Sequence, residues 1–129
     1  YYIQYNSLLR QYEKLLHQCE SLTIRVNICI NYKEHNGTVV WYNDTLVPVG
    51  CSLLNATIRV ARVEYTYWQA YQACFVNSIN GVSNRHPYYW MWLYWDRDSR
   101  SWKYGSVGAD QYILEHGDIV MWRYEAPGW

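Results

Sequence analysis

Apolar and polar residues alternate along this chain in two different rhythms, one helical and one extended. Over residues 1–21 the apolar side chains recur at steps of four and three, which is the heptad pattern of an amphipathic helix. No Gly or Pro interrupts the pattern. We therefore predict a helix over 1–21 that packs either on its own domain or, as its Tyr-rich stripe favours, against another chain. The stripe consists of Tyr1, Tyr5, Leu8, Tyr12, Leu15 and Cys19 and continues to Leu22.

The remaining residues carry mostly strand and turn signals. Residues 22–32 alternate apolar and polar side chains, as a half-buried strand does. Asn36-Gly37 is a strong hairpin signal. A second helix is predicted over 51–63, with Ser52 as its N-cap. Further strands are predicted at 38–42, 70–79, 88–95, 102–104 and 119–124.

The order of these elements predicts the fold class. One helix, two strands, a second helix and several strands are typical of an α+β fold in which a helix crosses one face of a mixed sheet. We expect a β-grasp-like sheet preceded by the N-terminal helix. The predicted organisation is an N-terminal helix at 1–21, a globular domain at 22–125 and a tail at 126–129. Two packed sheets without a crossing helix would contradict this prediction.

The strand at 88–95 is the strongest functional signal, because it is apolar on both faces. One face would cover the helix, and the other would expose a large apolar patch of the kind that marks interaction sites. Such a patch could be covered by a neighbouring subunit or by the terminal helix. It could also be an open platform for a sugar. Trp90, Trp92 and Tyr94 share one face and form the candidate receiving surface, opposite Met91, Leu93 and Trp95.

Composition narrows the possible partners. The 129 residues suit a single domain and include 15 Tyr and 8 Trp but one Phe, a bias typical of half-buried surfaces and interfaces. The 11 basic and 11 acidic residues balance, so the chain has no electrostatic reason to bind nucleic acid. No apolar run is long enough to be a transmembrane segment.

Three glycosylation sequons lie close together and favour an extracellular or cell-surface protein. Their acceptor residues are Asn36, Asn43 and Asn55, although the same residue types also form turns. The sequence starts at Tyr1 rather than Met, as expected if a signal peptide or membrane anchor has been removed.

The even number of cysteines predicts disulfides in that setting. Cys19 and Cys29 would lie at opposite ends of a rigid strand, about 25 Å apart, whereas a disulfide needs Cα atoms within about 7 Å. We therefore expect Cys29 to pair with Cys51 or Cys74, or Cys19 to pair across chains.

The sequence carries no signature of a catalytic site, a metal site or a cofactor. The four histidines, His17, His35, His86 and His116, do not lie at metal-ligand spacing from one another or from a cysteine. Gly105-Ser106-Val107-Gly108 lacks the Lys of a phosphate-binding loop. We therefore expect a protein that is not an enzyme.

Residues 22–125 resemble the family named for the C-terminal domain of transcobalamin. The ordered features are Thr38-Val39-Val40-Trp41-Tyr42, the helix around Ser52-Leu53-Leu54, Phe75 to Val82 with its Asn80-Gly81 turn, the Trp-rich strand, and Gly105 to Tyr112 followed by Glu115-His116-Gly117-Asp118. The resemblance implies a β-grasp domain and leaves function open. In transcobalamin this fold helps to cover cobalamin, but no cobalamin contact can be assigned here by residue. The sequon-rich, Tyr-rich style is also similar to that of secreted archaeal proteins.

Two functions follow as hypotheses. The first is a structural subunit that binds copies of itself in an extracellular filament or surface assembly, with the N-terminal stripe laid on the surface around Trp90, Trp92 and Tyr94. The alternative is a monomeric secreted domain that binds a ligand, either a carbohydrate or a cobalamin-like molecule.

Overall fold

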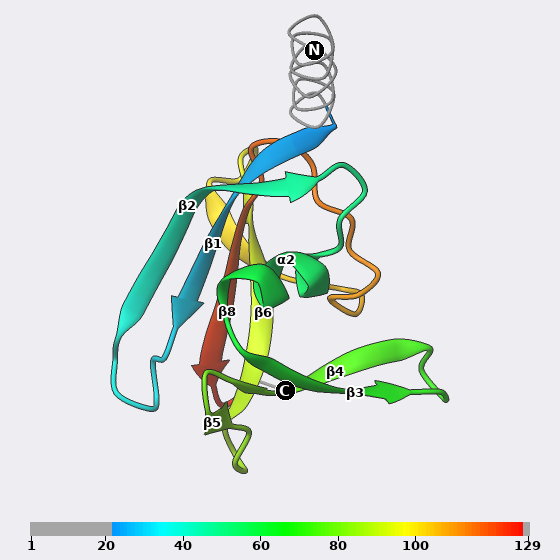
Figure 1. Ribbon diagram of the computed structural model, residues 1–129. Helices are drawn as coiled ribbons and strands as arrows, with labels where there is room; N and C mark the ends of the chain where they lie inside the picture. Colours follow the sequence, from blue (N-terminus) through cyan, green and yellow to red (C-terminus); the bar gives the residue numbers. More distant parts are fainter. Residues whose placement is uncertain (1–21, 128–129) are drawn as a thin grey trace, which may run out of the picture.

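The chain folds into two β-sheets and one short helix, seen in a computed structural model that describes residues 22–127 (Figure 1). The five-stranded sheet has the order β2-β1-β8-β6-β7, and the three-stranded sheet has the order β3-β4-β5. The helix α2 spans Leu53–Val60. The strands are β1 (Thr23–Asn31), β2 (Val39–Pro48), β3 (Val63–Trp68), β4 (Ala73–Ile79), β5 (Val82–Ser83), β6 (Tyr89–Asp96), β7 (Ser101–Tyr104) and β8 (Ile119–Glu125).

The predicted α+β, β-grasp-like fold with one sheet crossed by a helix is wrong. The described residues are mostly strand, they form two sheets, and α2 has only eight residues. The predicted helix over 51–63 ends early because the chain becomes extended at Ala61 and enters β3, a strand that the prediction missed. The β-branched and aromatic residues of β3 favour a strand over a helix. The predicted N-terminal helix at 1–21 lies outside the described residues.

The short helix is tied to both its own cap and the large sheet. The Ser52 hydroxyl accepts a hydrogen bond from the Asn55 amide at 3.2 Å, which confirms the predicted N-cap. The buried Thr57 hydroxyl donates to the Leu53 carbonyl and accepts from the Trp122 indole N–H, each at 2.8 Å. These contacts hold α2 against β8 and satisfy a polar group inside the core.

The large sheet is mixed because β1 and β8 run parallel while its other pairs are antiparallel. Its three central strands coincide with the strands predicted at 22–32, 119–124 and 88–95. We call one side the core face, since it packs on the buried residues of α2 and β4. Its buried members are Val26, Ile28, Ile30, Trp90, Trp92, Val120, Trp122 and Tyr124.

The opposite side, which we call the curled face, is covered by the chain's own tryptophans. Cys29, Met121 and Leu93 are neighbours in register on three adjacent strands, and all three are buried. Trp41 and Trp102 belong to the outermost strands β2 and β7, yet their rings lie 6.4 Å apart. Four strand spacings of about 4.8 Å would separate these strands in a flat sheet. The sheet therefore curls, which brings Trp41 and Trp102 together over this face.

Candidate functional site

A cavity of about 560 Å³ lies between β4 and β6, where the two sheets approach without pairing. Strand β7 pairs only with Leu93–Asp96, so residues 89–92 of β6 have no strand partner on that side. Strand β5 pairs only with Ser78 and Ile79 of β4, and the Asn77 carbonyl accepts from the Asn84 amide, which leaves residues 73–76 without a strand partner on the same side. The cavity wall includes residues 74–76 and 89–92. The cavity is thus bordered by two open strand edges.

Fixed aromatic rings form much of the wall. The Trp90 indole N–H donates to the Val82 carbonyl at 2.8 Å, and the Trp92 indole N–H donates to the Val107 carbonyl at 3.0 Å. Because both polar atoms are used internally, these rings present carbon to the cavity. A polar point remains at His86, whose Nδ1 lies 3.3 Å from the Tyr89 hydroxyl. The other lining residues carry no charged side chain: Cys74, Phe75, Val76, Pro87, Met91, Gly105, Val107, Gly108, Ala109, Trp122, Ala126 and Pro127.

Two polar side chains take the place of the missing strand between β4 and β6. Asn84 donates from Nδ2 to the Val76 carbonyl and accepts at Oδ1 from the Trp90 amide, both at 2.8 Å. Asp110 accepts from the Cys74 amide at 2.9 Å. These bonds satisfy backbone groups that would otherwise be unpaired, and Asn84, which bonds to both strands, fixes the distance between the two edges.

Gly105 closes one side of the cavity and must be a glycine for steric reasons. Its amide donates to the Trp92 carbonyl at 3.1 Å. A Cβ atom at this position would lie 2.0 Å from the Trp92 ring. The absence of a side chain therefore lets the chain pass directly over the indole.

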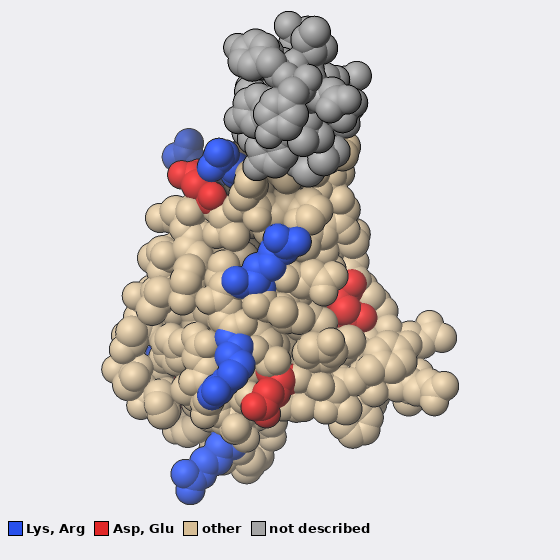
Figure 2. Space-filling model, viewed as in Figure 1, with Lys and Arg blue, Asp and Glu red and all other residues tan. Residues whose placement is uncertain are grey.

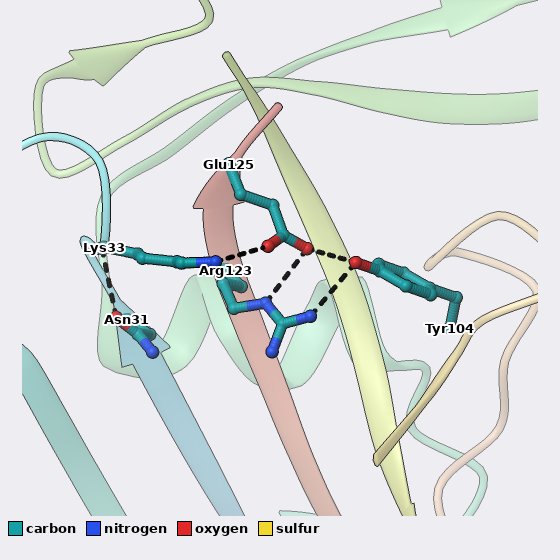
Figure 3. A network of polar contacts seen from close by, with 5 residues as sticks. All are labelled: Asn31, Lys33, Tyr104, Arg123 and Glu125. Atoms are coloured by element: carbon teal, nitrogen blue, oxygen red, sulfur yellow. Dashed lines mark hydrogen bonds and ion pairs between the residues drawn. The ribbon is translucent and has the colours of Figure 1, made fainter. Parts of the chain in front are cut away.

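A charged cluster on the curled face fixes the end of β8 (Figure 3). The Lys33 ammonium lies 3.1 Å from Oε2 of Glu125, and the Arg123 Nε lies 3.0 Å from Oε1. The Tyr104 hydroxyl also donates to Oε1 and accepts from the Arg123 guanidinium at 3.0 Å. Both carboxylate oxygens are therefore occupied. Since Ala126 and Pro127 follow directly and line the cavity, the cluster positions part of the cavity wall.

The lowered pKa of Glu125 indicates that this cluster stabilises the fold and does not bind a ligand or act as a base. Burial acts to raise the pKa of Glu125, but hydrogen bonds from Tyr104, Lys33 and Arg123 outweigh burial and hold the pKa below its usual value. The carboxylate is thus charged at neutral pH and fully engaged by its partners. It has no free oxygen with which to act as a base or to hold a ligand.

The structure separates the predicted interface residues. Trp90 is 3% exposed and Trp92 is 9% exposed, because both lie on the core face and in the cavity wall. Tyr94 is half-buried and stacks on Tyr112, with ring centroids 6.2 Å apart. Trp90 and Trp92 are therefore not an open receiving surface. The other predicted interface residues, Tyr1, Tyr5, Leu8, Tyr12 and Leu15, lie outside the described residues.

The sequon asparagines are all exposed, but their settings differ. Asn36 lies in the turn after β1, and its Oδ1 accepts from the Thr38 amide at 3.0 Å. Asn43 lies on β2 and Asn55 on α2. The Thr57 of the third sequon is buried and hydrogen-bonded in the folded chain.

The predicted pairing of Cys29 with Cys51 or Cys74 is wrong, because all three thiols are free. Cys29 lies on the curled face, Cys51 lies in the core cluster, and Cys74 is on β4 in the cavity wall. The sheet itself separates Cys29 from Cys51. Burial and the neighbouring Asp110 raise the pKa of the Cys74 thiol, which keeps it protonated at neutral pH. Cys19 lies outside the described residues.

Within residues 22–127, no three His, Cys, Asp or Glu side chains gather in a way that could hold a metal ion. The same part of the chain has no helix long and apolar enough to cross a membrane. The sequence could not indicate the cavity, because its wall combines short stretches that are up to about fifty residues apart. The Trp-rich strand was the one signal that pointed to it.

No protein-family model matches this chain, and no curated protein is similar to it in sequence. Solved structures that are similar in fold include the following two. Haptocorrin in complex with Cbi has a TM-score of 0.66 and 16% identity, over 81% of this chain and 25% of haptocorrin. A proposed metal binding protein from Ruminococcus gnavus ATCC 29149 has a TM-score of 0.59 and 10% identity, over 81% of this chain and 98% of that protein. This chain thus spans a quarter of haptocorrin. The likeness supports the fold of the transcobalamin C-terminal domain, as the sequence resemblance implied.

Proposed function

We propose that this protein is a non-enzymatic binding protein that holds a small molecule in the cavity between β4 and β6. The single observation that carries the proposal is a cavity of about 560 Å³ whose aromatic walls are already fixed by internal hydrogen bonds. Ligand sites in proteins are typically concave, mostly apolar and largely preformed, at about 300–1,000 Å³.

The wall chemistry selects an uncharged ligand with flat apolar faces. No Lys, Arg, Asp or Glu side chain lines the cavity, so an ionic group would lose its hydration without gaining an oppositely charged partner among these residue types. The ring nitrogens of His86 and the hydroxyl of Tyr89 in the wall offer hydrogen-bonding groups to amide or hydroxyl substituents. A cobalamin-like molecule or a carbohydrate has both features. The solved complex of haptocorrin with Cbi supports the first of these.

The burial of Trp90 and Trp92 favours binding over the filament hypothesis. That hypothesis needs these rings as a surface for a neighbour's helix, whereas both are almost fully buried within the chain. The same rings are well placed to contact a molecule inside the cavity.

Calorimetric titration with Cbi, cyanocobalamin and a neutral hexasaccharide tests the proposal. We expect saturable binding of at least one, abolished by Val107→Trp, which would fill the cavity from its rim. Val49→Trp is the matched control, because Val49 is also exposed but lies outside the cavity lining. Absence of binding to all three, or binding that Val107→Trp leaves unchanged, would contradict the proposal.

We also infer that the protein works outside the cell. The exposed asparagines of its three sequons support this inference. Intact-mass measurement of material from its native source should exceed the bare 15.6 kDa chain, and a mass equal to the bare chain would contradict glycosylation.

A further inference from the structure

Among the described strands that end a sheet, β3 is the least protected against pairing with another chain. Strand β2 has an irregular register with β1, it contains Asp44 with a positive φ, and it ends at Pro48. Strand β7 has four residues including Lys103, and β5 has two residues. Such bulges, prolines, lysines and short lengths are the devices that block edge-to-edge pairing. The six residues of β3, Val-Glu-Tyr-Thr-Tyr-Trp, include neither Lys nor Pro. The β3–β4 pair also has a register irregularity, but its extra residue, Asn77, lies on β4 and not on the edge strand.

The unpaired backbone groups of β3 can be assigned from its partner β4. The Cys74 amide is bonded to Asp110 and the Val76 carbonyl to Asn84, so both residues direct these groups away from β3. In an antiparallel ladder, residues opposite such positions also point away from the pair. Tyr67 lies opposite Cys74, and Tyr65 lies opposite Val76. The N–H and C=O groups of Tyr65 and Tyr67 therefore face outward from the edge.

The side chains of this hairpin are exposed and uncharged. Residues 65–84 contain no Lys, Arg, Asp or Glu. The projecting end of the β3–β4 hairpin is accordingly tan in Figure 2. The exposed fractions are 47% for Tyr65, 56% for Tyr67, 52% for Trp68 and 80% for Tyr71. Aromatic side chains of this size leave on the order of 500 Å² open per copy.

We propose that β3 pairs antiparallel with β3 of a second copy, about a two-fold axis at Thr66. This register places Tyr65 of each copy opposite Tyr67 of the other, so that all four outward N–H and C=O groups of each copy are used. It also stacks the four tyrosines on one face as cross-strand aromatic pairs. The contact is self-complementary and closed, as a two-fold dimer requires.

Charge and area both agree with a second copy as the occupant. The one charged residue of β3, Glu64, falls opposite Trp68 of the other copy in this register, so like charges are not paired. If most of the exposed aromatic surface of both hairpins is covered, the buried area reaches about 1,000 Å², the lower limit for a stable interface. The inference goes beyond ligand binding, because β3 does not line the cavity.

Sedimentation of the full chain across a range of concentrations tests the dimer. We expect a species of twice the 15.6 kDa chain mass. Tyr67→Pro removes an outward N–H without touching the β3–β4 ladder, and each dimer loses two hydrogen bonds. The dimer Kd should rise on the order of 10–100-fold. Tyr67→Thr is the matched control, since it removes the ring but keeps the N–H, and its Kd should rise less than that of Tyr67→Pro.

Hydrogen exchange at the Tyr65 and Tyr67 amides provides a second measurement that does not depend on the proline variant. Both amides should be protected in the dimer and exchange faster on dilution. A monomer at every concentration, a dimer that Tyr67→Pro does not weaken, or protection that does not change on dilution would each overturn the proposal. Ligand binding measured by calorimetric titration should be unchanged in Tyr67→Pro, which would show that the dimer contact and the ligand cavity are independent sites.

Discussion

Strands β6 and β3 are both rich in aromatic residues, yet the tertiary structure treats them in opposite ways. Five of the eight residues of β6 are aromatic, and each of the eight is buried or half-buried. Three of the six residues of β3 are aromatic, and five of the six are exposed. Strand β6 lies inside its sheet between β8 and β7, whereas β3 lies at an edge. Position in the sheet, rather than aromatic content, therefore decides whether such a strand is buried.

The cover over β6 comes from elements far away in sequence. Its core face packs against the cluster that includes Leu53, Leu54 and Val76, and Trp122 lies beside it on β8. Its curled face lies under Trp41 and Trp102. The two aromatic faces of β3 have no comparable cover among the described residues. The same residue types thus stabilise the fold in β6 and remain available for contact in β3.

The largest expected effect on stability is the loss of a buried tryptophan from β6, compared with the loss of an exposed tryptophan from β3. Trp92→Ala removes a buried ring and its hydrogen bond to Val107, and should lower the free energy of unfolding by about 3–5 kcal/mol. Trp68→Ala is the matched variant on β3 and should change it by less than about 1 kcal/mol, because that ring is half exposed. Urea denaturation at neutral pH and low protein concentration measures both. If both variants lost the same free energy of unfolding, the proposed difference between a buried β6 and an exposed β3 would be wrong.

An intermediate effect is expected at the charged cluster beside β6. Glu125→Gln leaves Arg123 and Lys33 without their carboxylate and should cost on the order of 2–4 kcal/mol at pH 7. The folded-state pKa of Glu125 lies below its usual 4.5. The stabilisation is therefore fully present above about pH 4.5 and is lost as the pH falls through the lowered value. The difference in urea stability between the two proteins should shrink as the pH falls below about 4.5. A difference that stays constant from pH 7 to pH 3 would show that charge is not its cause.

The smallest effect concerns reactivity rather than stability. Burial raises the pKa of Cys29 to about 11, so that about one thiol in a thousand is ionised at pH 8. Cys74 is only partly buried. Brief treatment with iodoacetamide at pH 8, followed by peptide mass mapping, should label Cys74 well before Cys29, and unfolding in urea should remove the difference. Labelling of Cys29 at the same rate in the folded protein would mean that Trp41 and Trp102 do not cover the curled face.

The cysteines also show why part of the site was beyond sequence analysis. Strand geometry correctly placed Cys29 on the face opposite Val26 and Ile28, but could not place Cys51 or Cys74 relative to it. That relation depends on which strands pair and how the sheet curls. The missed strand β3 has the same cause, since a short β-branched and aromatic segment after a helix is ambiguous until a partner strand is known.

The sequence by itself determined those parts of the local structure that depend on near neighbours. The alternation over 22–32, the Ser52 cap and the Asn80-Gly81 turn, with φ of 50° and 82°, depend on residues within a few positions of one another. Only the tertiary structure decided that β1 pairs in parallel with β8, that Trp41 meets Trp102, and that two open strand edges border a cavity. Each of these depends on the sum of many weak contacts between distant segments, and no single stretch of sequence contains that sum.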